Sequence, residues 1–217
     1  MMLAFALAGL IAGQATHAPA TALRPSSGQY RLPYADGTRL SVFDDDRSHR
    51  PVGGLDLVGE PREGRTHRIV ATAAGTVMAI DDGHHEQLSG RAASECRNNY
   101  VWLAHDNGEW TLYSHMRQGT TRREAGLEVG ERVAAGQYLG DEGAVGCAML
   151  SHLHFEVAVP APGERPIDAG GFLTGNADRQ RLRVPHFCNV PGGRVEKDAF
   201  YTAAACPEPS GAASPGA

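Results

Sequence analysis

The run NYVWLAHDNGEWTLYSH, residues 99–115, predicts a β-hairpin. Its two halves, 99–105 and 109–115, are rich in aromatic and branched side chains, which favour strands. Between them lies Asp106-Asn107-Gly108, a strong signal for the tight turn that joins two antiparallel strands. The centre of the chain is therefore expected to form antiparallel β-structure.

Further short runs on both sides of this hairpin alternate with glycine-containing turns. We expect strands at His67–Ala71, Gly75–Ile80, Gln137–Gly140 and His152–Val159. Several short strands in series predict an all-β fold, a small antiparallel sheet or sandwich. The longer connections 82–97 and 117–130 are expected to form the walls of a groove.

Composition supports this fold class and excludes one class of partner. The chain of 217 residues contains 27 glycines and 13 prolines. Together they exceed the usual share of about 12%, as expected for a chain rich in turns. The formal net charge of −5 argues against a nucleic-acid-binding protein, which normally carries a basic stripe.

The ends of the chain differ in composition from the centre. Residues 3–13 are an apolar run, too short for a bilayer span of about 20 residues, and small residues follow it. This pattern is typical of an export signal, with a buried or anchoring segment as the alternative. No later stretch reaches the length of a membrane span. We expect a signal peptide at 1–20, an N-terminal segment at 21–48, a core at 49–160, a C-terminal extension at 161–206 and a disordered tail at 207–217.

The four cysteines agree with export to an oxidising compartment. They allow three pairings, and none lies in a Cys-x-x-Cys pair that would indicate a structural zinc site. We expect Cys188–Cys206 to close a loop in the C-terminal extension and Cys96–Cys147 to tie two loops of the core. The alternative is four buried free thiols.

The stretch SHLHFEV, residues 151–157, offers the clearest chemistry. His152 and His154 are two positions apart, so on a strand they project from the same face, and the apolar residues between them face inward. Two such imidazoles can reach a common metal, or one can bind metal while the other transfers protons. They can equally be ordinary histidines on the polar face of a half-exposed strand.

Other histidines and a carboxylate could complete such a site. His115 ends the second half of the hairpin, where it could donate a hydrogen bond or move a proton. His49 and Asp56 flank a glycine-containing stretch, and with His154 they form a set of two imidazoles and one carboxylate. Three such ligands leave the fourth position of a catalytic zinc to water. Taken singly, each also fits a structural role at a turn, a strand end or the surface.

Taken in order along the chain, these motifs resemble the lysostaphin-type (LytM-like) zinc peptidases. The resemblance covers roughly residues 49 to 160 and is carried by Gly54-Leu55-Asp56-Leu57, Ile69-Val70-Ala71, Ala74-Gly75-Thr76-Val77, Tyr100-Val101-Trp102, Asn107-Gly108, Tyr113-Ser114-His115, Gly136-Gln137-Tyr138-Leu139-Gly140, Gly146 and residues 152–157. It implies a small antiparallel β fold, the duplicated hybrid motif, with a zinc-lined groove. It also implies an enzyme that cuts peptide bonds in bacterial cell-wall peptidoglycan.

The resemblance also implies roles for single residues. Asp56 and His154 correspond to zinc ligands, and His115 and His152 to the catalytic histidines, with one zinc ion per chain.

The chain departs from the family pattern at the first ligand. The usual pattern is His-x-x-x-Asp, but Val52 stands four residues before Asp56 and has no lone pair to offer. His49, seven residues before Asp56, is the nearest substitute and is expected to be the third ligand. His67 is the alternative, although it lies on the other side of Asp56 in the sequence.

Three functions follow from these observations. The first is a zinc metalloendopeptidase, exported to the periplasm or the extracellular space, that hydrolyses peptidoglycan peptides. The second is a non-catalytic domain of the same fold that binds the cell wall or regulates amidases. The third is a β-sheet binding module with incidental histidines. No nucleic acid and no membrane span of the mature chain are expected.

Overall fold

A computed structural model describes residues 22–61, 63–64, 66–92, 95–161, 170–173 and 181–207. The expected signal peptide at 1–20 lies outside the described residues, as does the expected disordered tail apart from its first residue. In the part of the chain that is described, no helix is long and apolar enough to cross a membrane.

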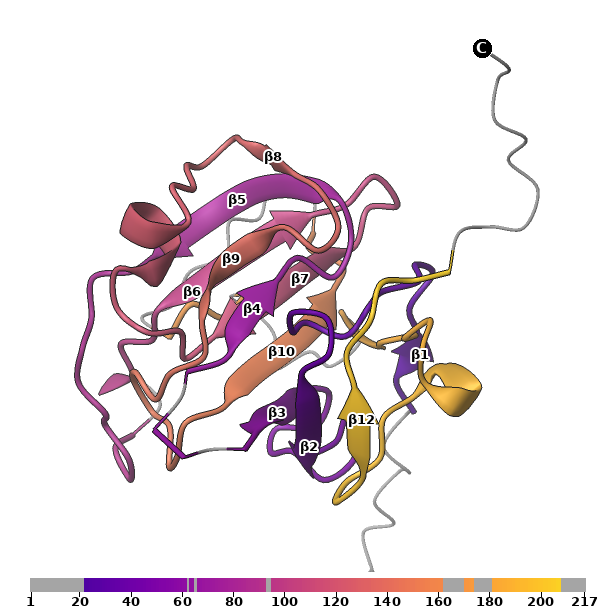
Figure 1. The fold of residues 1–217 in the computed structure, drawn as a ribbon, viewed down its shortest axis with the longest axis horizontal. Helices are drawn as coiled ribbons and strands as arrows, with labels where there is room; N and C mark the ends of the chain where they lie inside the picture. The colour runs from indigo at the N-terminus through magenta and orange to yellow at the C-terminus, as the bar shows by residue number, and fades with distance from the viewer. Residues whose placement is uncertain are drawn as a thin grey trace, which may run out of the picture.

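One large sheet dominates the molecule (Figure 1), and its strands follow the order β12-β2-β3-β10-β7-β6-β5-β8. These strands are β2 (Arg39–Asp44), β3 (Leu55–Glu60), β5 (Gly75–Asp81), β6 (Tyr100–Ala104), β7 (Trp110–Ser114), β8 (Arg132–Val133), β10 (Leu153–Ala158) and β12 (Phe200–Thr202). β11 (Leu182–Val184) pairs with β10 and also, in parallel, with β1 (Arg24–Pro25). All other pairs in the large sheet are antiparallel, which confirms the expected all-β antiparallel fold.

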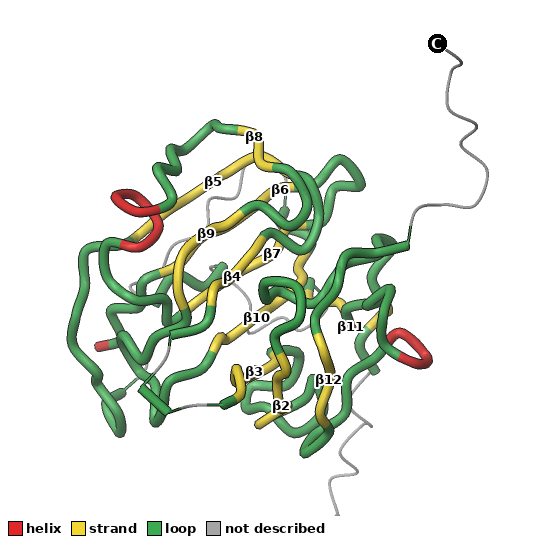
Figure 2. Tube along the Cα trace, viewed as in Figure 1, coloured by secondary structure: helices red, strands yellow, loops and turns green. Residues whose placement is uncertain are grey.

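A second sheet of two strands covers one face of the large one. It consists of β4 (Arg68–Val70) and β9 (Tyr138–Asp141), which are drawn in front of the large sheet in Figure 1. The helical elements whose bounds lie within the described residues are a π-helical turn, η2 (Thr120–Glu124), and a 3-10 turn, η3 (Pro191–Gly193). Figure 2 shows that loops make up most of the remaining chain.

The predicted hairpin is formed by β6 and β7. At its turn, the His105 and Glu109 backbones are paired, with the His105 N–H donating to the Glu109 carbonyl at 2.9 Å. The Gly108 N–H donates to the His105 carbonyl at 3.0 Å, and Gly108 has a φ of +81°. Glycine adopts this left-handed conformation without the steric cost of a Cβ, which is why the turn can close here.

Apolar side chains fill a core on each face of the large sheet. The larger core lies between the sheet and β4–β9 and includes Leu103, Leu139 and Phe155. The smaller core, on the opposite face, includes Trp102 and Leu112. Because side chains alternate along a strand, Phe155 and its alternate neighbours on β10 fill the larger core while the residues between them face the other way. His154 and Glu156 of β10 therefore lie on the face opposite β4–β9.

Both ends of the described chain contribute to the same sheet. β2, from the expected N-terminal segment, lies between β3 and β12, and β12 comes from the expected C-terminal extension. The two segments also meet outside the sheet, where the Tyr30 N–H donates to the His186 carbonyl and the Cys188 N–H donates to the Tyr30 carbonyl, each at 2.9 Å.

Two disulfides, Cys96–Cys147 and Cys188–Cys206, use all four cysteines in the pairing expected from the sequence. The first ties loop 82–97 to loop 143–151. The second closes the C-terminal extension. The other long loop, 117–130, contains no cysteine and instead packs against β9. There the Asp141 N–H donates to the hydroxyl of the buried Thr120 at 3.0 Å.

Candidate active site

Strand register places three polar residues in one row across the sheet. On β10, His154 is paired with Asp56 of β3 on one side and with Ser114 of β7 on the other. Residues that are directly opposite in neighbouring strands project from the same face. All three therefore project away from the larger core. His152 immediately precedes β10 and His115 immediately follows β7. Because the two strands are antiparallel, both residues lie at the same edge of the sheet, on the same side of this row.

His49 reaches this row from the loop that precedes β3. The His49 N–H donates to the Asp45 carbonyl at 2.9 Å, and the chain then folds back, so that the His49 and His154 ring centroids are 4.8 Å apart. Gly54 makes room for the two rings. A Cβ at that position would lie 2.5 Å from Cε1 of His154 and 3.1 Å from Nδ1 of His49.

Three side chains converge as a set of metal donors. His49, Asp56 and His154 each offer one ligand atom, and the three atoms lie within 4.8 Å of one another. His49 turns Nε2 toward Asp56 Oδ1 at 3.5 Å because its Nδ1 donates to the Pro51 carbonyl at 2.7 Å. His154 turns Nδ1 toward the same oxygen at 3.0 Å and uses Nε2 to bond Glu156 Oε1 at 3.1 Å. Two imidazoles with outer hydrogen-bond partners and one carboxylate fit a zinc ion.

The electrostatics of the set centre on Asp56. Burial alone would raise the pKa of its carboxyl, but the contacts with the His152, His154 and His49 imidazoles outweigh burial and hold the pKa well below its usual range. Burial likewise would lower the pKa of the His154 imidazole, but hydrogen bonds to Asp56 and Glu156 raise that pKa to about 10. The site is therefore built around an ionised carboxylate.

The two expected catalytic histidines lie beside this set as a pair. The ring centroids of His115 and His152 are 4.7 Å apart. His115 Nδ1 is 2.8 Å from the Val145 carbonyl, and His152 Nδ1 is 2.8 Å from the Leu150 carbonyl. A carbonyl only accepts hydrogen bonds, so Nδ1 of each ring carries a proton and Nε2 keeps a lone pair when the ring is neutral. His152 points Nε2 toward Asp56 Oδ1 at 3.5 Å.

His115 has an unusual backbone and an unusual environment. Its φ is +66°, a conformation that residues other than glycine seldom adopt and that is often found at functional sites. Burial, together with the neighbouring His152 and His154, lowers the pKa of its imidazole to about 3. The ring is therefore neutral at neutral pH and able to accept a proton at Nε2.

The structure thus brings together His49, Asp56, His115, His152 and His154, the five residues expected from the sequence. It does not bring His67 to them. That ring packs against Gly59 and bonds the Pro61 carbonyl through Nε2 at 3.1 Å. His49, rather than His67, lies beside Asp56 and His154.

Other residues at the site were not expected from the sequence. Glu156 orients His154, and it is the next residue on the same face of β10. The Phe172 ring stands almost perpendicular to the His154 ring, with centroids 5.5 Å apart. Ser114 Oγ is buried, and among the described residues it has no hydrogen-bond partner. Strand alternation could have indicated Glu156, but no sequence signal points to Phe172, which lies beyond the matched motifs.

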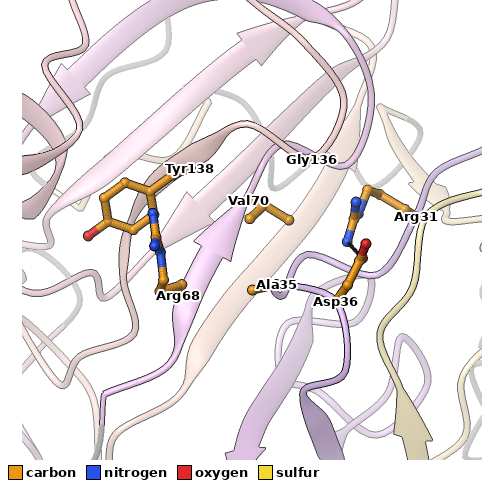
Figure 3. Close-up of a pocket in the computed structure, with 7 residues that line it drawn as sticks. All are labelled: Arg31, Ala35, Asp36, Arg68, Val70, Gly136 and Tyr138. Atoms are coloured by element: carbon orange, nitrogen blue, oxygen red, sulfur yellow. Dashed lines mark hydrogen bonds and ion pairs between the residues drawn. The ribbon is translucent and has the colours of Figure 1, made fainter.

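A cavity of about 260 Å³ lies apart from these residues (Figure 3). It is lined by Arg31, Ala35, Asp36, Arg68, Val70, Gly136 and Tyr138. Its polar side chains are engaged with one another: Arg31 forms an ion pair with Asp36, and the Arg68 guanidinium lies 4.1 Å from the centre of the Tyr138 ring. None of the five candidate residues lines it.

The model of peptidase family M23 matches residues 51–169, which is more than half of the chain. The chain belongs to peptidase family M23. The resemblance to lysostaphin-type peptidases is confirmed by this match, which contains Asp56, His115, His152 and His154 and begins just after His49.

Individual relatives of this M23 chain differ from it in length. The peptidoglycan DD-endopeptidase ShyC of Vibrio cholerae serotype O1 is 30% identical over 124 residues, which cover 57% of this chain and 25% of the relative. The chain thus matches a quarter of that protein. A solved zinc-containing peptidase from Vibrio cholerae is 24% identical, with a TM-score of 0.38 and coverage of 68% of this chain and 38% of that one. The catalytic domain of lysostaphin from Staphylococcus simulans is 17% identical, with a TM-score of 0.38 and coverage of 66% and 85%.

Proposed function

We propose that this chain is an exported zinc metalloendopeptidase that hydrolyses peptide bonds in bacterial cell-wall peptidoglycan. The observation that carries the proposal is the convergence of His49, Asp56 and His154 beside the His115–His152 pair. Membership of peptidase family M23 supports peptide-bond hydrolysis. The name of the Vibrio cholerae relative supports peptidoglycan as the substrate class.

His49, Asp56 and His154 would hold the zinc ion. When bound, the ion supplies Lewis acidity, which lowers the pKa of water and polarises a carbonyl group. The chain contributes the donor geometry: the Pro51 carbonyl fixes one ligand ring and Glu156 fixes the other. Asp56 contributes a negative charge that offsets part of the charge of the ion.

His115 and His152 would handle the protons. Each ring is held through Nδ1, so its Nε2 is the atom that faces the reaction. A neutral ring takes a proton at Nε2 from the attacking water and returns it to the leaving amine. The same nitrogen, once protonated, donates a hydrogen bond to the oxyanion that develops on the scissile carbonyl. Because the pKa of His115 is lowered to about 3, this ring starts in the neutral form.

Two features support export. Residues 1–20 have the composition of an export signal, and two disulfides are typical of proteins that fold in an oxidising compartment. The periplasm and the extracellular space both meet this requirement and both give access to peptidoglycan.

The test is a digestion of purified peptidoglycan by the chain, purified without chelators. We expect one zinc ion per chain and released fragments whose masses and new amino termini identify hydrolysed peptide bonds. His152→Ala should abolish the fragments. A chain that binds no zinc and sediments with peptidoglycan without releasing fragments would overturn the proposal. It would instead support a non-catalytic domain that binds the cell wall or regulates amidases.

A further inference from the structure

One loop orients both histidines of the proposed catalytic pair. The Val145 carbonyl accepts from His115 and the Leu150 carbonyl accepts from His152, each at 2.8 Å. Both carbonyls belong to residues 143–151, here called the orienting loop. The loop closes on itself where the His152 N–H donates to the Gly143 carbonyl at 3.0 Å. Any shift of this loop therefore changes the direction of two Nε2 atoms at once.

The centre of the orienting loop is attached to one other segment, residues 86–98. The Gly146 N–H donates to the Glu86 carbonyl at 2.8 Å, and the Gly146 carbonyl accepts from the Leu88 N–H at 2.6 Å. Gln87 Nε2 donates to the Ala148 carbonyl at 2.9 Å. These bonds place the attachment between Val145 and Leu150, the two residues whose carbonyls hold the rings.

Asn98 adds a buried contact at the same place. It is only 1% exposed, and its Oδ1 accepts from the Cys147 N–H at 3.1 Å. The approach is close, because a Cβ on Gly146 would lie 1.8 Å from that oxygen, and Gly146 has a φ of +84°. Asn98 Nδ2 donates to the Gly170 carbonyl at 2.9 Å, which links the loop to the segment that carries Phe172.

The segment that holds the loop has an anchored end and an exposed stretch. His84 is bonded through its backbone to the buried Asn99, but residues 85–92 are mostly exposed. Hydrogen bonds of such exposed backbone groups open locally at little cost in free energy. Cys96 is 4% exposed and lies next to β6, which belongs to the rigid sheet. The Cys96–Cys147 bond therefore joins the centre of the orienting loop covalently to a fixed part of the molecule.

We propose that the Cys96–Cys147 disulfide is a positioning element for His115 and His152, acting through the orienting loop. The inference rests on the proposed function, in which these two rings transfer protons. None of the three proposed zinc ligands belongs to the loop. Loss of the disulfide should therefore leave zinc binding intact and reduce turnover, because misplacement of catalytic groups by about 1 Å can cost about a hundredfold in rate.

The chain provides a matched control in its second disulfide, Cys188–Cys206, which contacts neither ring. In the full-length protein, Cys96→Ala/Cys147→Ala should lower kcat about tenfold to a hundredfold on a soluble crosslinked peptide from peptidoglycan. KM and the zinc dissociation constant should stay within about twofold. Cys188→Ala/Cys206→Ala should keep kcat within about twofold when assayed at saturating zinc, because the segment that this disulfide closes meets the site through the turn before His49 and contacts neither ring of the pair. The proposal is overturned if the first variant keeps its kcat or if the control loses as much.

A second pair of variants keeps the test decisive if the cysteine variant does not fold. Asn98→Ala removes the acceptor for the Cys147 N–H and leaves the disulfide in place. Its control is Asn189→Ala, because Asn189 lies next to the other disulfide and bonds the Ala204 and Ala205 carbonyls. Asn98→Ala should lower kcat at least about fivefold with unchanged zinc binding, a partial loss of the same positioning effect. Equal kcat values in the two variants would contradict the proposal.

Nuclear magnetic resonance of histidines labelled with ¹⁵N separates this proposal from the proposed function. In the unmodified protein, His115 and His152 should each show a protected Nδ1–H signal. These signals should broaden or disappear when the Cys96–Cys147 bond is absent and persist when Cys188–Cys206 is absent. Unchanged signals would overturn the positioning role. An inactive unmodified protein with the expected signals would count against the proposed function alone.

Discussion

Asp56 is the residue around which the candidate site is assembled. One of its oxygens, Oδ1, faces nitrogens of three imidazoles, at 3.0 Å from His154 and 3.5 Å from both His49 and His152. A buried carboxylate is tolerated only where charges or hydrogen-bond donors compensate it. The carboxylate therefore holds together rings that come from two different parts of the chain, the loop before β3 and the start of β10.

The ligand role of His49 gives the sharpest prediction at this scale. His49→Ala should weaken zinc binding by more than about a hundredfold and abolish hydrolysis, since loss of a ligand exceeds the tenfold to hundredfold loss typical of an outer partner. His115→Ala and His152→Ala should retain the metal and lose turnover. The zinc dissociation constant and the rate of peptide release, measured for each variant, test this prediction. If His49→Ala keeps its zinc and its activity, the ligand assignment fails and His67→Ala becomes the next variant.

Glu156 should matter for the metal although it does not contact it. Its carboxylate accepts from His154 Nε2 and so keeps Nδ1 directed at the ligand set. Glu156→Gln preserves the shape but removes the charge, and it should weaken zinc binding about tenfold. Competition with a chromogenic chelator measures the change. An unchanged zinc dissociation constant would show that the charge of Glu156 has no part in orienting the ring.

At the scale of elements, the sequence predicted strands where the pattern alone was sufficient. β4, β5, β6, β7, β9 and β10 all lie within one or two residues of the expected runs. β3 was not expected, because Asp56 and Gly59 are poor strand formers. It is a strand because β2 and β10 pair with it on both sides. β12 has only three residues, too few for a periodic pattern.

Some features of the candidate site could likewise be predicted from sequence patterns, and others could not. Asp56, His115, His152 and His154 stand in motifs, so the ordered resemblance could single them out. The carbonyl partners of His115 and His152 could not be predicted, because every residue has a carbonyl and only the path of loop 143–151 selects two of them. Such contacts depend on tertiary structure, and a single sequence contains no pattern for them.

Glu109, at the start of the second hairpin strand, anchors the N-terminal segment. Its carboxylate accepts from the Ser27 N–H at 2.7 Å, the Gly28 N–H at 3.1 Å and the Tyr30 hydroxyl at 2.8 Å. Burial alone would raise the pKa of this carboxyl. The hydrogen bonds lower the pKa by more than burial raises it, so the net shift is downward. A carboxyl group whose pKa is lower in the folded state than in the unfolded state stabilises the fold at pH values above the unfolded-state pKa. This stabilisation is lost as the pH falls through the folded-state pKa.

Glu109→Gln should therefore reduce the free energy of unfolding at pH 7 by about 2 kcal/mol, the scale of hydrogen bonds to a charged group. The difference from the unmodified protein should shrink as the pH falls through the lowered pKa of Glu109, because the protonated carboxyl is neutral like the glutamine amide. Urea unfolding at a series of falling pH values measures the difference. A gap that does not shrink in acid would mean that the ionised form is not what anchors the segment.

At the scale of the whole molecule, the C-terminal extension braces the loop that carries His49. The Arg194 guanidinium pairs with both oxygens of the buried Asp46, with Nε 2.8 Å from Oδ1. The Lys197 N–H donates to Asp45 Oδ2 at 3.3 Å. Asp45 and Asp46 lie at the beginning of the turn that brings His49 to the site, so residues near the end of the chain support a proposed zinc ligand.

Arg194→Gln should weaken this support, since it leaves Asp46 buried without its cation. We expect zinc binding to weaken about tenfold, as when an outer partner of a ligand is removed. Lys197→Gln is the matched control, because the Lys197 ammonium pairs with Asp44 and its loss leaves the backbone contact to Asp45 in place. Equal zinc dissociation constants for the two variants would disprove the bracing role.

The position of β12 beside β2 also affects how the protein is made. β2 is synthesised long before its outer neighbour, β12 (Phe200–Thr202), because most of the described chain lies between them in the sequence. In the interval, β2 has a row of N–H and C=O groups without partners, and an open strand edge of this kind can pair with another chain. Pairing with another chain can therefore compete with folding until β12 has been made and covers this edge.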